Sequence, residues 1–188
     1  MPAITTDAVL FGLNDAKVSP LATDLTTAPT YGTAMDCPGV STLSAQPIME
    51  NKENRGDGVI LHTTSRMVGM DIEFKVAMLP LAMLPMIQGG TITSGGVTPA
   101  GKQTYSLKQT DAGPQYFKIE GVWDPGEVGI GDTHLSVFKV KCTEPPAVVV
   151  NDANGDYGDL TIKGRAVFTL SDKKLYEIVI NETAIPLV

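Results

Sequence analysis

The residue types that could carry out chemistry are few and scattered along this chain of 188 residues. There are two histidines, His62 and His134, and two cysteines, Cys37 and Cys142. Each histidine lies on the alternating pattern of a predicted strand, and no nucleophile elbow or base-orienting motif accompanies either one. The glycine pairs lack the Lys-Ser/Thr that a phosphate-binding loop needs. We therefore expect no enzymatic activity and no cofactor.

Three short motifs could suggest binding sites. Residues 152–156 have the acidic spacing that opens a calcium loop, but Tyr157 replaces the sharp-turn glycine and Lys163 replaces the bidentate glutamate. A hairpin turn explains the same residues, so we expect no metal site. Residues 55–57 spell an adhesion tripeptide within a charged turn, and residues 181–183 match a glycosylation acceptor without any visible secretory signal.

Composition narrows the class of protein. The hydrophobic fraction of 43% is that of an ordinary globular chain, and 19 glycines and 13 prolines suit many short strands joined by tight turns. A net charge of −7 argues against a protein held on nucleic acid by phosphate neutralisation. The longest apolar run, residues 76–87, contains two prolines and is too short to span a bilayer, so we expect no membrane partner. The cysteines show no metal-ligand spacing and are expected to be reduced thiols.

The stretch from Arg66 to Gly90 organises the rest of the chain. Asp71, Glu73 and Lys75 occupy one parity, which predicts a strand with one wet face. The opposite parity is apolar and predicts the buried face: Val68, Met70, Ile72, Phe74, Val76 and Met78. Residues 79–88 then predict a short helix with Pro80 in its first turn and the glycine pair at its end, although Pro85 conflicts with a regular helix.

Residues 40–79 predict two long antiparallel strands joined by a charged, protruding loop over residues 51–58. After the helix, residues 91–101 predict a linker. Four further strands are expected at residues 102–109, 115–123, 133–143 and 160–170, the third of these with a β-bulge near Val137–Phe138 or with both faces buried. A last strand over residues 175–181 is expected to point Tyr176, Ile178 and Ile180 inward.

The predicted fold is mainly β: a β-sandwich of about seven or eight strands with one short flanking α-helix and a long protruding hairpin loop. Residues 1–38 are polar and weakly periodic, and predict an extended N-terminal arm containing short strands at 8–13 and 16–21. Residues 39–188 are expected to form a single domain.

The order of these elements resembles the major tail tube proteins of long-tailed bacteriophages. The resemblance is most specific over residues 43–90, especially residues 51–58, 69–74 and 81–84 and the pair Gly89-Gly90. It implies a tail-tube-like β-sandwich that forms hexameric rings, which stack into a hollow tube through which DNA passes during ejection. It also implies a location in the virion tail, with assembly in the host cytoplasm.

The resemblance further implies partners: other copies of the chain, a tape-measure protein, a tail terminator and distal tail or baseplate proteins. Viral DNA would pass through the lumen without specific binding, which suits an acidic chain because like charge removes the gain from counterion release. A long loop would reach the next ring. The residues assigned to that inter-ring contact loop are Glu50, Asn51, Lys52, Glu53, Asn54, Arg55 and Asp57.

The wet face of the strand, Asp71, Glu73 and Lys75, is expected to line either the lumen or a seam between subunits, and its mixed sign leaves both open. The alternative function is a β-sandwich binding module, such as a capsid decoration domain or a carbohydrate- or protein-binding domain. Such a module would be expected to cluster exposed aromatic residues, yet Trp123 is the one tryptophan and lies on an apolar parity.

Overall fold

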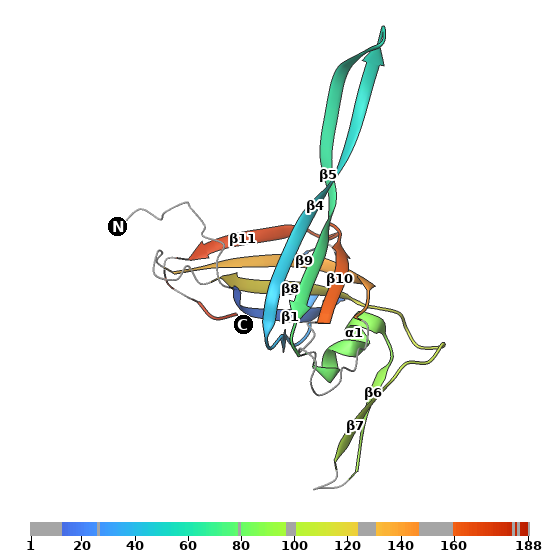
Figure 1. Ribbon diagram of the computed structural model, residues 1–188, viewed down its shortest axis with the longest axis vertical. Helices are drawn as coiled ribbons and strands as arrows, with labels where there is room; N and C mark the ends of the chain where they lie inside the picture. Colours follow the sequence, from blue (N-terminus) through green and yellow to red (C-terminus); the bar gives the residue numbers. More distant parts are fainter. Residues whose placement is uncertain are drawn as a thin grey trace, which may run out of the picture.

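In a computed structural model the chain is built mainly of β-strands around one hydrophobic core (Figure 1). The structure describes residues 13–25, 27–78, 80–96, 101–123, 131–146, 160–181, 183 and 185–187. The strands are β1 (Leu13–Thr23), β2 (Thr30–Tyr31), β3 (Met35–Asp36), β4 (Val40–Gly56), β5 (Val59–Val76), β6 (Thr91–Gly95), β7 (Lys102–Ser106), β8 (Tyr116–Trp123), β9 (Asp132–Glu144), β10 (Leu160–Ala166) and β11 (Tyr176–Asn181). The predicted fold class is confirmed, with eleven described strands in place of seven or eight.

One antiparallel sheet folds over on itself to give two layers. Its strand order is β2-β1-β8-β9-β10-β5-β4, with β11 also paired to β9 and β3 to β1. Figure 1 shows β4 and β5 crossing over β8 and β9. Leu43 of β4 reaches β8, since its Cδ2 lies 2.7 Å from where a Cβ on Gly121 would stand. Gly121 therefore allows the two layers to approach closely.

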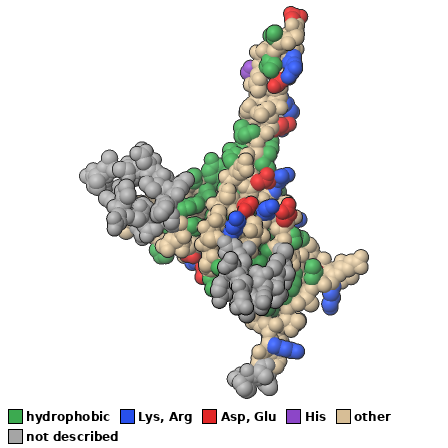
Figure 2. All heavy atoms as spheres, viewed as in Figure 1, with side chains coloured by type: hydrophobic (Ala, Val, Ile, Leu, Met, Phe, Trp, Pro, Cys, Tyr) green, Lys and Arg blue, Asp and Glu red, His purple; other side chains and the backbone are tan. Residues whose placement is uncertain are grey.

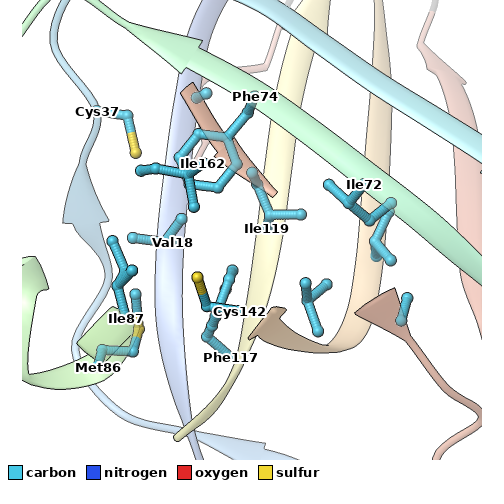
Figure 3. Close-up of a cluster of buried hydrophobic side chains, with 14 of the residues drawn as sticks. Val18, Cys37, Ile72, Phe74, Met86, Ile87, Phe117, Ile119, Cys142 and Ile162 are labelled. Atoms are coloured by element: carbon cyan, nitrogen blue, oxygen red, sulfur yellow. The ribbon is translucent and has the colours of Figure 1, made fainter. Parts of the chain in front are cut away.

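The core lies between these layers and is closed by the short helix (Figure 3). Alternate side chains of each strand point into it, as the period of two requires. Fully buried members come from β1, β5, β8, β9, β10 and the helix: Val18, Ile72, Phe74, Phe117, Ile119, Val137, Val140, Ile162, Met83 and Ile87. Cys37 and Cys142 are buried free thiols in the same cluster, as expected, and burial raises their pKa values to about 12 and about 11.

The predicted alternation of β5 is confirmed from Met70 to Val76, where every second side chain is buried. The prediction is wrong for the two outermost residues of the apolar parity, Val68 and Met78. Val68 is 39% exposed because it lies where the strand leaves the body, and Met78 is 61% exposed because the strand ends at Val76. The bulge predicted in β9 is also confirmed: β8 advances two residues, from Phe117 to Ile119, while its partner β9 advances three. The extra residue switches which parity of β9 faces the core.

The helical segment resolves the conflict posed by Pro85. A 3-10 turn, η1 (Leu81–Met83), is followed by a new α-helix, α1 (Leu84–Gln88), so that Pro85 falls in the first turn of α1, where no amide bond is lost. Gly89 ends α1 with φ of +84°, and a Cβ there would lie 2.0 Å from the Ala112 carbonyl oxygen. Only glycine fits this position.

The short strand expected at residues 16–21 is confirmed as part of β1, which is built into the sheet rather than extended as an arm. β1 lies inside the sheet between β8 and the short β2 and β3, and buries Ala16 and Val18. The sequence signal was weak because Pro20 and polar residues interrupt its alternation. Residues 1–12, including most of the strand expected at 8–13, lie outside the described residues.

Three other predictions are corrected. Residues 91–101 are not simply a linker, since β6 and β7 pair as a separate two-stranded sheet from Thr91↔Ser106 to Gly95↔Lys102. β10 ends at Ala166, and Phe168 and Leu170 are exposed because the chain turns there, with the Thr169 amide donating to the Lys174 carbonyl. In β11, Tyr176 and Ile178 are 40% and 52% exposed rather than inward.

A buried ion pair joins that turn to β9. Lys139 Nζ lies 2.6 Å from Asp24 Oδ2, with 10% and 8% of the two side chains exposed, and Asp24 also accepts the amide of Leu170. Burial alone would raise the pKa of Asp24, but the hydrogen bonds from Lys139 and the Leu170 amide bring it below its ordinary value of 3.8. The stabilisation is thus complete above pH 3.8 and is lost as pH falls through the lower folded-state pKa.

Asp24→Asn is expected to lower the free energy of unfolding by about 3 kcal/mol near neutral pH, because Lys139 keeps a buried, uncompensated charge. Urea unfolding at pH 7 and pH 3 measures this difference. The free energy of unfolding should also fall less between pH 7 and pH 3 in the variant than in the wild type. Glu73→Gln is the matched control, since its partner Lys75 is 3.8 Å away in solvent and the change should cost less than about 0.5 kcal/mol. Equal effects of the two substitutions would contradict the role of the Asp24 pair.

Candidate assembly interface

The distal half of the β4–β5 hairpin projects from the body (Figure 1). The two strands pair from Val40↔Val76 to Gly56↔Val59, and both of their faces are largely exposed beyond Met70. Asp57 and Gly58 form the turn with φ of +50° and +80°, the pattern of the two-residue turns that match the twist of paired strands. The charged loop predicted over residues 51–58 is therefore wrong as a loop, because residues 51–56 continue the ladder of β4.

The residues assigned to the inter-ring contact all lie on this distal hairpin or at its turn. Its charged side chains pair with one another: Arg66 Nη2 lies 2.6 Å from Glu50, and Arg55 Nη2 lies 2.6 Å from Glu53. Lys52 is 3.5 Å from Glu50. Exposed pairs of this kind each contribute about 0–1 kcal/mol, so they do not explain why the ribbon extends so far.

An exposed apolar triplet at the tip was missed by the sequence reasoning. Val59, Ile60 and Leu61 are 58%, 52% and 64% exposed. Leu61 lies across Gly56, with its Cδ1 2.7 Å from where a Cβ on that glycine would stand. The signal was a run of three apolar residues directly after an Asp-Gly turn within a polar hairpin. Three adjacent exposed aliphatic residues at a tip indicate a contact surface.

The wet face of β5 continues across the neighbouring strands. Asp71, Glu73 and Lys75 stand opposite residues Arg165, Lys163 and Thr161 of β10. Arg165 Nε donates to Asp71 Oδ1 at 2.9 Å, and this bond raises the pKa of Arg165. Lys75 is 3.8 Å from Glu73, and Lys163 is 3.2 Å from Glu144. Figure 2 shows these acidic and basic side chains gathered where the hairpin meets the body. All of them except Lys75 line a polar depression.

The charge of this polar face is balanced rather than acidic. Three carboxylates, of Asp71, Glu73 and Glu144, stand beside the cations of Lys75, Lys163 and Arg165. All 14 lysines and arginines of the chain lie in the described part, which holds as many aspartates and glutamates. The net charge of −7 therefore comes from seven acidic residues outside it: Asp7, Asp124, Glu127, Asp152, Asp156, Asp159 and Glu182. A lumen role for the polar face gains no support from its sign.

The described residues bring together no catalytic constellation. His62 lies on the exposed hairpin, while His134 Nε2 is 2.9 Å from Asp132 Oδ2. Asp132 is 5% exposed and also accepts from Asn181 and the Ile185 amide, which makes it a joint between β9, β11 and the C-terminal segment. Burial acts to raise the pKa of Asp132, and these hydrogen bonds lower it overall.

Metal and membrane motifs give no positive finding. Within the described ranges no group of three His, Cys, Asp or Glu side chains is placed to hold a metal, and the possible calcium loop at 152–156 lies outside them. No described helix has the length and apolar character to cross a bilayer. The adhesion tripeptide at residues 55–57 lies at the hairpin turn.

No protein-family model and no curated protein matches the chain. A function therefore has to be argued from the two surfaces described above, the distal hairpin and the polar face.

Replacing Asp71 and Glu73 together with lysine is expected to lower the melting temperature by no more than about 8 °C, because each of the two exposed pairs contributes at most about 1 kcal/mol. Any assemblies that the wild-type protein forms under the electron microscope should still form in the variant, since both ion pairs join residues of the same subunit. The control is the exchange Asp71→Arg with Arg165→Asp, which keeps the charge of the face. Loss of assembly in the lysine variant alone would place the face in a seam between subunits.

Proposed function

We propose that the chain is a virion structural protein, a major tail tube subunit of a long-tailed bacteriophage. It would assemble into rings, hexameric in the family that it resembles, and the rings would stack into a hollow tube that conducts DNA. Its function would be performed by self-assembly, without catalysis or a cofactor. The observation that carries the proposal is the exposed distal hairpin.

A two-stranded ribbon with both faces in water is marginal by itself. Here β4 and β5 remain paired from Pro47↔Met70 to Gly56↔Val59 without covering any other described element. The ribbon ends in the exposed apolar triplet Val59, Ile60 and Leu61. Such a ribbon is stabilised when a partner covers it. A neighbouring copy in a stacked ring is the partner that the tail tube resemblance supplies.

The edge of the sheet also favours lateral self-association. β4 is the terminal strand at its end of the sheet order, and an open edge can accept another strand. Pro47 and the bulge between Ile48 and Met49 interrupt that edge, so the segment available for regular pairing lies before Pro47. Pairing around a ring would close the edges of all subunits into one barrel.

DNA passage requires a wall that does not retain phosphates. Binding to DNA gains affinity when lysine and arginine release condensed counterions. The cations of the polar face are already paired with carboxylates, and the residues outside the described part add seven acidic charges and no basic one. This balance disfavours a nucleic-acid binder and is compatible with a wall that DNA passes, although the sign of the polar face does not by itself favour the lumen.

Negative-stain electron microscopy of the purified protein tests the proposal directly. Rings or hollow tubes are expected. Small monodisperse particles at all concentrations would overturn it and favour the alternative, a β-sandwich binding module.

Shortening the hairpin is expected to abolish stacking while sparing the fold. The register Asn51↔Ser65 allows residues 51–65 to be replaced by Asn-Gly, so that Glu50 and Arg66 remain paired above a two-residue turn. Circular dichroism and a melting temperature close to wild type would verify the body, and microscopy would report tubes. Tubes of normal length from this variant would rule out the contact role.

A milder variant separates hairpin length from hairpin chemistry. Val59→Thr, Ile60→Thr and Leu61→Thr together keep the β propensity and the ladder but remove the apolar tip. Tube formation should require a higher protein concentration, measured by sedimentation. The matched control changes three polar residues of the same strand, Thr63, Thr64 and Ser65, to alanine. This control should leave the concentration required for tube formation unchanged.

A further inference from the structure

The main sheet has a second long open edge, at β11. This strand pairs with β9 alone, and no described strand lies on its other side. Figure 1 shows β11 as the outermost strand of its layer, as β4 is in the layer that crosses it. The remaining end of the sheet is formed by β2 and β3, which have only two residues each. β4 and β11 are therefore the two long edges available for a further strand.

Every second residue of β11 directs its backbone away from β9. The Phe138 amide donates to the Leu175 carbonyl at 3.2 Å, and the register of β11 with β9 continues from this pair without a shift. In an antiparallel ladder, hydrogen-bonded and non-hydrogen-bonded pairs alternate. Residues in phase with Leu175 therefore bond to β9. The residues whose N–H and C=O groups point to the open side are Tyr176, Ile178 and Ile180.

The edge of β4 before Pro47 is oriented in the same way. Proline has no N–H, so a sheet accepts it where that position points away from the paired strand. The register of β4 with β5 is continuous from Thr42 to Ile48, so Leu43 and Ala45 share the phase of Pro47. Leu43 and Ala45 thus offer their N–H and C=O groups to the open side of β4.

The side chains of the two edges also match. On both strands, the residues that offer their backbone to the open side line one apolar groove of about 280 Å³ between the layers: Leu43, Ala45 and Pro47 of β4, and Tyr176 and Ile178 of β11. On the outer face, Ser44 and Gln46 of β4 and Glu177 of β11 are exposed. Placed side by side, the two edges would therefore join apolar to apolar on the inner face.

β11 has none of the features that keep natural edges unpaired. Its six residues contain no proline and no lysine, and its ladder with β9 contains no bulge. Its side chains Tyr176, Ile178 and Val179 are 40%, 52% and 43% exposed. An exposed apolar edge of this kind is prone to accept another strand.

We propose that the edge of β4 before Pro47 in one copy of the chain pairs with the open edge of β11 in the next copy. This inference rests on the proposed ring and names the two strands that close it. The edges differ, so one contact satisfies both and repeats around a closed ring, whereas pairing each edge with itself would need two kinds of two-fold contact. The pairing is antiparallel, as is every pairing within the sheet.

The outer faces select a register for this pairing. Ser44 opposite Val179 of the neighbouring copy places Gln46 opposite Glu177, where the side-chain amide can donate to the carboxylate. On the inner face the same register pairs Leu43 with Ile180 and Ala45 with Ile178. The apolar surface of one subunit thereby continues into the next.

Disulfide trapping between two variants, each with one added cysteine, tests the contact. Ser44→Cys mixed with Val179→Cys should give a disulfide-linked dimer on mild oxidation, because non-hydrogen-bonded partners bring their Cβ atoms within reach. Neither variant alone should dimerise. Cys37 and Cys142 stay unchanged, because both are buried thiols with raised pKa values. The control Thr104→Cys, exposed on β7, should give no dimer with Ser44→Cys.

Other outcomes of the trapping experiment would overturn the pairing. A dimer from Val179→Cys alone would identify β11 of a second copy as the partner of β11. Absence of a dimer from the mixture would also reject the pairing. Negative-stain microscopy of the same samples separates the two proposals: rings or tubes without the disulfide reject only this contact, and absence of both rejects the tube as well.

A backbone variant tests the edge without an added cysteine. Ile178→Pro removes an N–H from the open side and leaves the bonds to β9, so the circular dichroism spectrum should be unchanged. Lateral association, measured by sedimentation, should weaken about tenfold or more, as expected for one lost hydrogen bond. Ile178→Val keeps the N–H and should associate as the wild type does. Equal association of the proline and valine variants would contradict the proposal.

Discussion

The structure depends on one strand that serves two environments. From Met70 to Val76, β5 buries every second side chain in the core, and Ile72 and Phe74 are 2% and 1% exposed. From Val59 to Val68 the same strand, paired only with β4, leaves nearly all of its side chains in water. The buried half anchors the exposed half, because a strand cannot slip by one residue without turning its whole apolar set outward. The projecting hairpin is therefore held in a fixed direction by core packing.

The rest of the fold supports that anchor. β10 pairs with β5 in register over seven residues, and β9 pairs with β8 as well as with β10 and β11. α1 closes the end of the core with Met86 and Ile87, and its carbonyl at Met86 accepts the amide of Gln115. The few buried polar groups are paired, as Asp24 with Lys139 and Asp132 with Asn181 show. These paired groups hold the body together.

What the body presents to other molecules is of three kinds: an apolar hairpin tip, a neutral ion-paired face and an apolar groove. Each has a different physical requirement. The tip needs a covering surface, the polar face is satisfied within one subunit, and the groove needs an apolar segment. The self-assembly proposed above would meet the first requirement. The seven acidic residues that give the sequence its net charge lie outside the described residues.

The sequence by itself determined the elements whose periodicity is strong and local. The buried parity of residues 70–76, the bulge in β9, the end of α1 at Gly89 and the mainly-β class were all predictable, because alternation and glycine chemistry act over a few residues. Only the tertiary structure decided where weak patterns belong: β1 between β8 and the short β2 and β3, the charged segment 51–56 as paired strand, and β11 with apolar side chains facing a groove. These depend on pairing partners more than a hundred residues away for β1, and on which face a neighbouring layer covers, neither of which a local pattern contains.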